Sequence, residues 1–214
     1  MRRLWVLPLG IGLDYNLKVG AEGTDLADRA WARVRWTEAR QVTDLLGWRP
    51  VAGQEPDPAL PPQVFYEGLV SQNRLVQAAQ FLAVALPRWE AVAWAARAVR
   101  DQRSDSEREA GEIEALKRAL LWVQDPTDVR RRAAFDAAEM APATSPERLA
   151  ALAAYFSGGP VTPDDCEPIQ APHDAAGKLA AGAVLAAVFS GAEPFQSLGK
   201  RLEEGVALAG AGGS

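Results

Sequence analysis

Apolar residues recur at helical spacing along most of the chain after residue 62. In "RLVQAAQFLAVAL", residues 74–86, apolar side chains return every third or fourth position, which is the period of an amphipathic helix. The next segment, "PRWEAVAWAARAVRDQ" at 87–102, is apolar on nearly every side, and such a helix is usually covered by neighbours on several faces. We therefore expect the 87–102 helix to lie at the centre of the fold.

Capping residues, prolines and glycines mark where the helices begin and end. The polar residues that can cap helix starts are Thr37, Asn73, Ser104 or Ser106, Asp125 and Ser145. Pro126 and Pro146 follow two of these caps and suit the first helical position, where the backbone nitrogen has no partner to lose. Gly47 and the pair Gly158–Gly159 can end helices, because glycine readily adopts the left-handed conformation that follows a last turn. These signals predict short connections between helices.

The pattern predicts an all-α protein, a compact irregular array of about nine helices in antiparallel or angled pairs. No convincing strand follows residue 35, and short connections leave successive helices antiparallel or sharply angled. Alanines at interior positions, such as Ala154 and Ala183, allow helix axes to approach closely. We assign residues 1–35 to a non-helical N-terminal arm, 36–210 to a single helical domain and 211–214 to a disordered tail.

The N-terminal segment has no sustained hydrophobic period. "MRRLWVLPLGIGL" combines basic and apolar residues as a secretory signal does, but Pro8, Gly10 and Gly12 interrupt its apolar run, so we expect no signal peptide. The run is also too short to span a bilayer as a helix. Three alternatives stay open for this segment: a short hairpin, an ordered arm on the helical domain, or a tail added by an upstream start codon.

Composition narrows the chemistry that we expect. The chain has 28 Asp and Glu against 23 Lys and Arg, and an acidic chain is poorly suited to neutralising nucleic-acid phosphates. One cysteine, Cys166, and one histidine, His173, cannot supply an internal disulfide or the usual zinc ligands. Binding of magnesium or calcium by carboxylates alone stays open, although no calcium-loop motif is present. We assign no catalytic residue, metal site or cofactor, no nucleic-acid partner and no membrane span, and we expect a reducing, cytoplasmic location.

For the single histidine and the single cysteine, we compare a chemical role with an ordinary structural role. His173 follows Pro172 at the expected start of a helix, where a surface histidine beside a cap is common. A general acid–base role is the alternative, because the pKa of histidine lies near working pH. Cys166 lies in an acidic loop, which makes it a poor nucleophile, so we expect an inert thiol.

The chain has seven tryptophans, of which we place Trp89, Trp94 and Trp122 in or near the core. The other four lie in less regular N-terminal sequence. Tryptophan is favoured where proteins bind one another, because it buries a large area at a small entropic cost. The candidate partner contacts among the tryptophans are Trp5, Trp31, Trp36 and Trp48. Packing of these rings on their own domain is the alternative.

Three consecutive arginines are the other conspicuous feature. In "WVQDPTDVRRRAAFDAAE", Arg130, Arg131 and Arg132 span too wide an arc of a helix to converge on one ligand. Spacings of four residues favour ion pairs of Arg132 with Asp128 and with Asp136. We expect a solvated, ion-paired helix face. A contact with a partner or an anion through Arg130 and Arg131 is the alternative.

Five segments in a fixed order carry a likeness to a known family. They are "VRWTEARQV", "LPRWEAVAWAARAVR", "ALLWVQDPTDVRRRAAFDAAE", "SPERLAALAAYFSGG" and "HDAAGKLAAGAVLAAV". Together, over residues 34–210, they resemble a family of uncharacterised bacterial all-helical proteins from gene neighbourhoods of type VI secretion. The resemblance implies a bacterial, cytoplasmic accessory protein, and it brings no catalytic motif that could be carried over.

The function that we expect is non-enzymatic protein–protein interaction, as an accessory, adaptor or chaperone-like component of a bacterial secretion system. Its partner is another protein, whose identity the sequence does not name, and the oligomeric state is equally open. One alternative is an enzyme or small-ligand-binding protein with a site of carboxylates and arginines within the helical bundle. A second alternative is an immunity protein that blocks a bacterial toxin.

Overall fold

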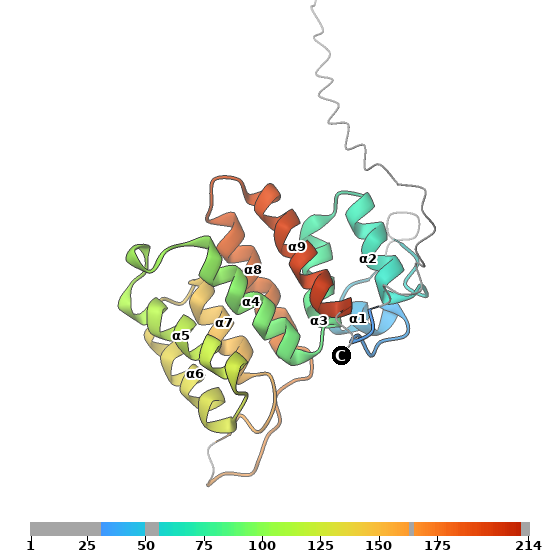
Figure 1. Ribbon diagram of the computed structural model, residues 1–214. Coiled ribbons are helices and arrows are strands. Elements are labelled where there is room, and N and C mark those ends of the chain that lie inside the picture. The colour runs from blue at the N-terminus through green and yellow to red at the C-terminus, as the bar shows by residue number, and fades with distance from the viewer. Residues whose placement is uncertain (1–30, 50–55, 163–164, 211–214) are drawn as a thin grey trace, which may run out of the picture.

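The computed structural model describes residues 31–49, 56–162 and 165–210, which form nine α-helices, one short 3-10 helix and no β-strand (Figure 1). In chain order the α-helices are α1 (Ala39–Leu46), α2 (Pro62–Ser71), α3 (Leu75–Ala85), α4 (Arg88–Gln102), α5 (Ala110–Gln124), α6 (Asp128–Met140), α7 (Pro146–Tyr155), α8 (Ala175–Phe189) and α9 (Pro194–Gly210). The all-α prediction is confirmed. Trp5, most of the expected arm and the expected tail lie outside the described residues. None of the described helices combines the length and apolar character that a membrane crossing requires.

The helices pack in two groups on either side of a central pair. Helices α4 and α8 pack together through the middle of the molecule (Figure 1). Helices α5, α6 and α7 pack against one another on one side, and α7 also packs closely on α8. Helices α1, α2, α3 and α9 form the other side, where α3 contacts α8 and α9 contacts α4.

Helix α4 lies in the core, as its apolar character predicts. Two of its tryptophans form hydrogen bonds to neighbouring helices. Trp94 is 1% exposed, and its indole N–H donates a 2.7 Å hydrogen bond to the carbonyl of Arg201 on α9. The indole N–H of Trp89 donates to the carbonyl of Val123 near the end of α5, at 3.1 Å. Trp122 is buried as well. The prediction that these three tryptophans belong in or near the core is confirmed.

Two of the expected helix boundaries are confirmed by the local geometry. The hydroxyl of Ser145 accepts a hydrogen bond from the backbone N–H of Arg148 at 3.2 Å, and Pro146 occupies the first position of α7. Gly47 follows α1 with a φ of 71°, in the left-handed region that glycine adopts without steric cost. Both signals depend only on neighbouring residues, which is why the sequence shows them.

Four capping assignments are wrong by one or more residues. The residues that precede the helices are Glu38, Arg74, Glu109 and Thr127, in place of Thr37, Asn73, Ser104 or Ser106, and Asp125. In each case the expected cap belongs to the connection before the helix. Asn73 has a φ of 56° in the turn after α2, a conformation that asparagine tolerates, and Ser104 caps the short 3-10 helix Asp105–Glu107.

The beginning of α8 packs directly on the end of α3, which brings three helix ends together. A β-carbon on Gly177 would lie 2.8 Å from the carbonyl oxygen of Ala83 and 2.9 Å from the α-carbon of Val84. Glycine alone permits this approach of two backbones. Since α4 begins three residues after α3 ends, the start of α4 lies close by.

Candidate functional site

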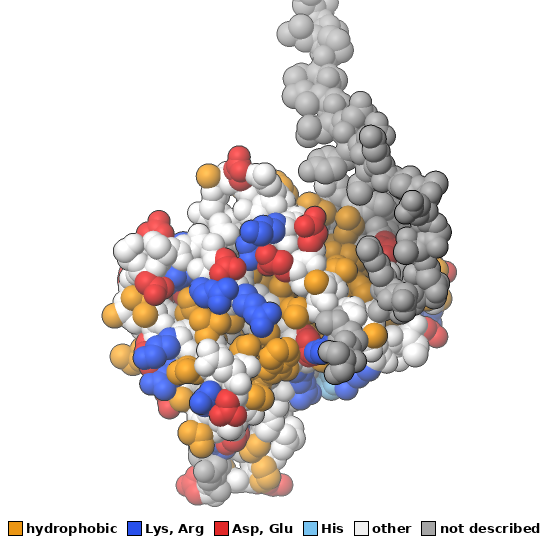
Figure 2. Space-filling view, in the orientation of Figure 1, with side chains coloured by type: hydrophobic (Ala, Val, Ile, Leu, Met, Phe, Trp, Pro, Cys, Tyr) orange, Lys and Arg blue, Asp and Glu red, His pale blue; other side chains and the backbone are white. Residues whose placement is uncertain are grey.

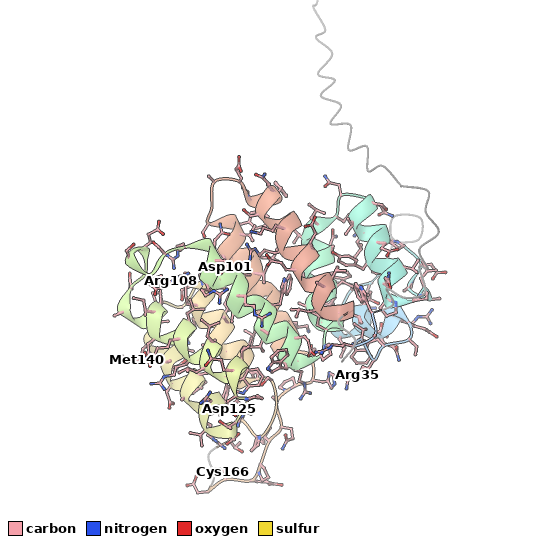
Figure 3. All side chains as sticks on the ribbon, viewed as in Figure 1. Arg35, Asp101, Arg108, Asp125, Met140 and Cys166 are labelled. Atoms are coloured by element: carbon pink, nitrogen blue, oxygen red, sulfur yellow. The ribbon has the colours of Figure 1, made fainter. Side chains whose placement is uncertain are left out.

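A pocket of about 500 Å³ opens where the ends of α3, α4 and α8 meet the segment that precedes α1. We call it the Arg35 pocket. Its polar lining consists of Arg33, Arg35, Trp36, Arg88, His173 and Asp174, and residues 83–87 with Gly177 complete the wall. Figure 3 labels Arg35 beside α1 and the start of α4, and Figure 2 shows the pale-blue histidine between blue basic side chains at this lower rim.

Two helices begin at the Arg35 pocket, and both leave their first backbone N–H groups without a capping side chain. Pro87 precedes α4 and Asp174 precedes α8, and neither side chain accepts a capping hydrogen bond. The first N–H groups of a helix have no partner within the helix and carry the positive end of its dipole. The backbone therefore adds to the positive potential of the pocket.

Arg35 is held between two rings at the mouth of the pocket. Its guanidinium carbon lies 4.4 Å from the centroid of the Trp36 ring, a cation–π distance. The same guanidinium contacts both ring nitrogens of His173. The rings of Trp36 and His173 meet edge to face, with centroids 5.7 Å apart. Arg35 therefore contacts both rings and also lines the pocket.

The carboxylates of this region are paired with other cations. Glu90, buried at the start of α4, accepts from Arg33 at 2.5 Å. Asp174 forms an ion pair with Lys178 one turn along α8.

Arg88 donates one N–H to the carbonyl of Ser157 at 3.1 Å. In the described part of the chain, neither Arg35 nor Arg88 is paired with a carboxylate. Two guanidinium charges in the pocket therefore lack a neutralising partner.

His173 is neutral near pH 7 in this environment. Burial, followed by the positive charges of Arg35 and Arg88, lowers the pKa of His173, and the carboxylate of Asp174 opposes this to a smaller degree. The contact with Arg35 also requires a neutral imidazole. A guanidinium only donates hydrogen bonds, so the ring nitrogen that faces it must be an acceptor. The expectation of an exposed histidine next to a helix start is confirmed, and its place in a basic cluster is new.

The described residues do not bring together a metal-ligand set. No three His, Cys, Asp or Glu side chains of this part of the chain lie close enough to share an ion. Cys166 is exposed on the loop between α7 and α8 (Figure 3). What the Arg35 pocket offers chemically is hydrogen-bond donors and positive charge at a partly apolar surface, which suits an anionic group.

The tryptophans that we proposed as partner contacts fall into different environments. Trp31 is buried and packs on Tyr66, with ring centroids 5.1 Å apart. Trp48 is half-buried and packs on the core. Trp36, also half-buried, lines the Arg35 pocket and a second pocket of about 170 Å³ with Pro61 and Pro62. Of the described tryptophans, Trp36 therefore has the surroundings that suit a binding role.

Arg131 is not part of a solvated face, and that expectation is wrong for this residue. It is 3% exposed and donates to the carbonyls of Tyr155 and Pro160 at 2.9 and 2.8 Å. It also donates to Asp128 at 2.8 Å. The expected pair of Asp128 with Arg132 is confirmed at 3.0 Å. Arg131 points inward from α6, and its hydrogen bonds to these carbonyls hold the loop after α7 against α6.

Arg130 likewise makes contacts within the fold. It donates to the carbonyl of Leu121 at 2.7 Å and lies 3.4 Å from a carboxylate oxygen of Asp125. These bonds fasten the corner between α5 and α6.

A buried ionic cluster was not expected from the sequence. Glu147 on α7 is fully buried, and one of its oxygens accepts from Arg103 and from Arg108, each at 2.8 Å. Glu112 is also buried and accepts from Arg103 at 3.1 Å. This cluster ties the connection between α4 and α5 to α7. No local pattern distinguishes these carboxylates from exposed ones.

The fold and the pocket define an all-helical protein with a basic pocket at the meeting point of three helix ends. The model of a family of unknown function, DUF6931, matches residues 65–209, and the chain belongs to this family. The expected likeness to an uncharacterised helical family is confirmed to that extent. No curated protein and no solved structure matches the chain. The matched part includes Arg88 and His173 and begins after Arg35 and Trp36.

Proposed function

We propose that the protein binds a partner protein without catalysing a reaction. The observation that carries this proposal is the position of Trp36, whose half-buried ring lies between the Arg35 pocket and the pocket next to Pro61. Side chains of a partner can enter the hollow on each side of the indole. Tryptophan and arginine are enriched at the centres of protein interfaces, and here Arg35 lies against Trp36.

The setting that we propose is that of an accessory or adaptor component of bacterial type VI secretion. This part of the proposal rests on the resemblance of residues 34–210 to proteins from such gene neighbourhoods. Affinity purification of the tagged protein from its host, followed by mass spectrometry, should recover components of the secretion machinery. Recovery of proteins from unrelated systems alone would remove this setting and leave the binding function in place.

A substitution at Trp36 tests the binding function directly. Trp36→Ala should lose a partner that the wild-type protein retains in a pull-down, because the ring lines both pockets. Trp48→Ala is the matched control, since it removes another half-buried tryptophan of the same region that lines neither pocket. Circular dichroism verifies that both variants fold. Equal recovery of the partner by both variants would refute the role of Trp36.

Binding of a small ligand is the second candidate function, and the size of the Arg35 pocket favours it. Its volume of about 500 Å³ lies within the usual range for small-molecule sites, and charged groups converge there from three parts of the chain. A ligand that binds only the folded state raises the melting temperature. A thermal-shift screen of organic acids, nucleotides and metal ions would support this candidate if one class alone stabilised the protein by several degrees.

A further inference from the structure

The charges of the Arg35 pocket favour a negatively charged occupant. Arg35 and Arg88 have no carboxylate partner in the described part of the chain, and each keeps N–H donors beyond those already used. The starts of α4 and α8, which have no capping side chain, add the positive ends of two helix dipoles. Because Glu90 and Asp174 are already paired with other cations, they do not supply the missing negative charge.

The walls of the pocket indicate an organic rather than an inorganic anion. Trp36 stands on one side, and Val84, Leu86 and Pro87 are among the apolar residues that line the rest. A hydrated inorganic anion gains little from such a surface, whereas a carboxylate on a carbon skeleton covers it. A planar carboxylate also matches the planar edge of a guanidinium, with two parallel hydrogen bonds.

We infer that the Arg35 pocket binds an organic carboxylate, whose oxygens accept from Arg35 and Arg88 while its carbon skeleton packs against Trp36. The inference rests on the proposed binding function, because it assigns the chemistry of the group that enters the pocket. Two sources share this chemistry: an acidic side chain or chain end of a partner protein, and a free organic acid. The experiment below distinguishes them.

His173 should gain a proton when the carboxylate binds. The charged groups that face it are Arg35 from the segment before α1, Arg88 from the start of α4, and Asp174 beside it. A carboxylate that draws the Arg35 guanidinium toward the pocket frees the ring nitrogen that now accepts from it, and its negative charge favours the imidazolium. Binding should therefore strengthen between pH 8 and pH 6, while the carboxylate itself stays ionised.

The histidine provides its own probe, since His173 is the only one in the chain. In the untagged full-length protein its ring signals can be followed by NMR without ambiguity. We would titrate in glutarate, a glutamate-rich peptide and inorganic phosphate in separate experiments. Saturable shifts of the His173 signals with glutarate or the peptide, and weaker or no shifts with phosphate, are expected.

Arg35→Gln should weaken carboxylate binding roughly tenfold to hundredfold, because it removes a charge-assisted hydrogen bond. Arg97→Gln is the matched control, since Arg97 is exposed on α4 outside the pocket and its loss changes the net charge equally. Arg88→Gln should weaken binding as well, and thermal unfolding would verify that the fold survives the loss of the bond to Ser157.

Each outcome decides a different point. Binding of the peptide alone assigns the carboxylate to a protein partner, and binding of glutarate assigns it to a free acid and favours the second candidate function. Either result supports the inference. Phosphate binding as tight as carboxylate binding, equal weakening in the Arg35 and Arg97 variants, or no shift at millimolar concentrations would overturn it. Those results would leave the partner binding tested at Trp36 untouched.

Discussion

The start of α6 and the Arg35 pocket each contain three arginines. All three at α6 are paired with a carboxylate, whereas in the pocket Arg33 is paired and Arg35 and Arg88 have no carboxylate partner among the described residues. At α6, Arg130, Arg131 and Arg132 all donate to main-chain carbonyls and pair with acidic side chains of the same corner. In the pocket, Arg35 faces two aromatic rings and Arg88 a single carbonyl. Figure 3 shows Asp125, beside the α6 corner, well separated from Arg35.

The difference shows what makes an arginine available to a ligand. A guanidinium has five N–H donors in a rigid plane, so an arginine at a helix corner can satisfy several carbonyls at once and stabilise the fold. An arginine whose charge has no carboxylate partner keeps its capacity for an external anion. By this criterion the conspicuous run of three arginines is structural, and Arg35 and Arg88 of the pocket are the candidates for function.

The largest expected effect concerns the buried arginine of α6. Arg131→Gln should destabilise the protein by about 2–4 kcal/mol, because two carbonyls lose their donors in a buried place. Arg35→Gln should change the free energy of unfolding by less than about 0.5 kcal/mol, as exposed substitutions usually do. Urea unfolding of both variants compares them directly. Similar losses would erase the distinction between the two regions.

A substitution at Gly177 tests the packing of α8 on α3 without changing any charged side chain of the pocket. Gly177→Ala should cost about 1–3 kcal/mol, because the added methyl group meets the backbone of Ala83 and Val84. Gly199→Ala on α9 is the matched control, since a β-carbon there meets no atom within 4 Å. Thermal unfolding would measure both. A Gly177 variant as stable as the Gly199 variant would show that α3 and α8 can move apart at little cost.

Acid should affect the α6 corner through Asp128. Hydrogen bonds from Arg131, and then from Arg132, lower the pKa of Asp128 below its usual value. A lowered pKa stabilises the folded state above the ordinary Asp range near pH 4, and this contribution is lost as the pH falls through the folded value. Asp128→Asn should lose less stability than the wild type between pH 7 and pH 3. Because Asp128 is largely exposed, the difference should stay below about 1 kcal/mol.

The smallest expected effect concerns His173 and lies in a different pH range. The fold favours the neutral ring, so its contribution to stability is complete above pH 6.5 and falls as the pH drops through the lowered pKa. His173→Gln should make stability slightly less dependent on pH in that range. NMR titration of the ring should show its midpoint rising in Arg35→Gln and staying unchanged in Arg97→Gln. An unchanged midpoint in both would contradict the contact between Arg35 and His173.

Local signals account for the features that could be predicted. The periodic apolar stretch at 87–102 indicated the core helix, and Ser145 with Pro146 marked the start of α7. The cap assignments that were wrong, such as Asn73 and Asp125, concern polar residues in connections between helices. In these connections more than one residue can precede the first helical position. Neighbouring residues indicate that a helix begins, and tertiary packing selects at which residue.

The Arg35 pocket was largely hidden from sequence reasoning for a physical reason. Its polar side chains lie near positions 35, 88 and 173, and no repeating pattern links residues so far apart. Trp36 and His173 were singled out for being unusual residue types, whereas Arg35 and Arg88 look like ordinary surface arginines. Tertiary packing brings them together, including the approach of α8 to α3 at Gly177.

The amino-acid sequence by itself determined an all-helical fold, because helical period and capping depend on residues within a few positions of one another. It also indicated that Trp89, Trp94 and Trp122 lie in or near the core, but not that Trp31 does. The tertiary structure alone decided which arginines are paired within the fold and which have no carboxylate partner. That outcome depends on the carbonyls and carboxylates that distant segments bring within hydrogen-bonding distance, and a linear pattern does not contain those distances.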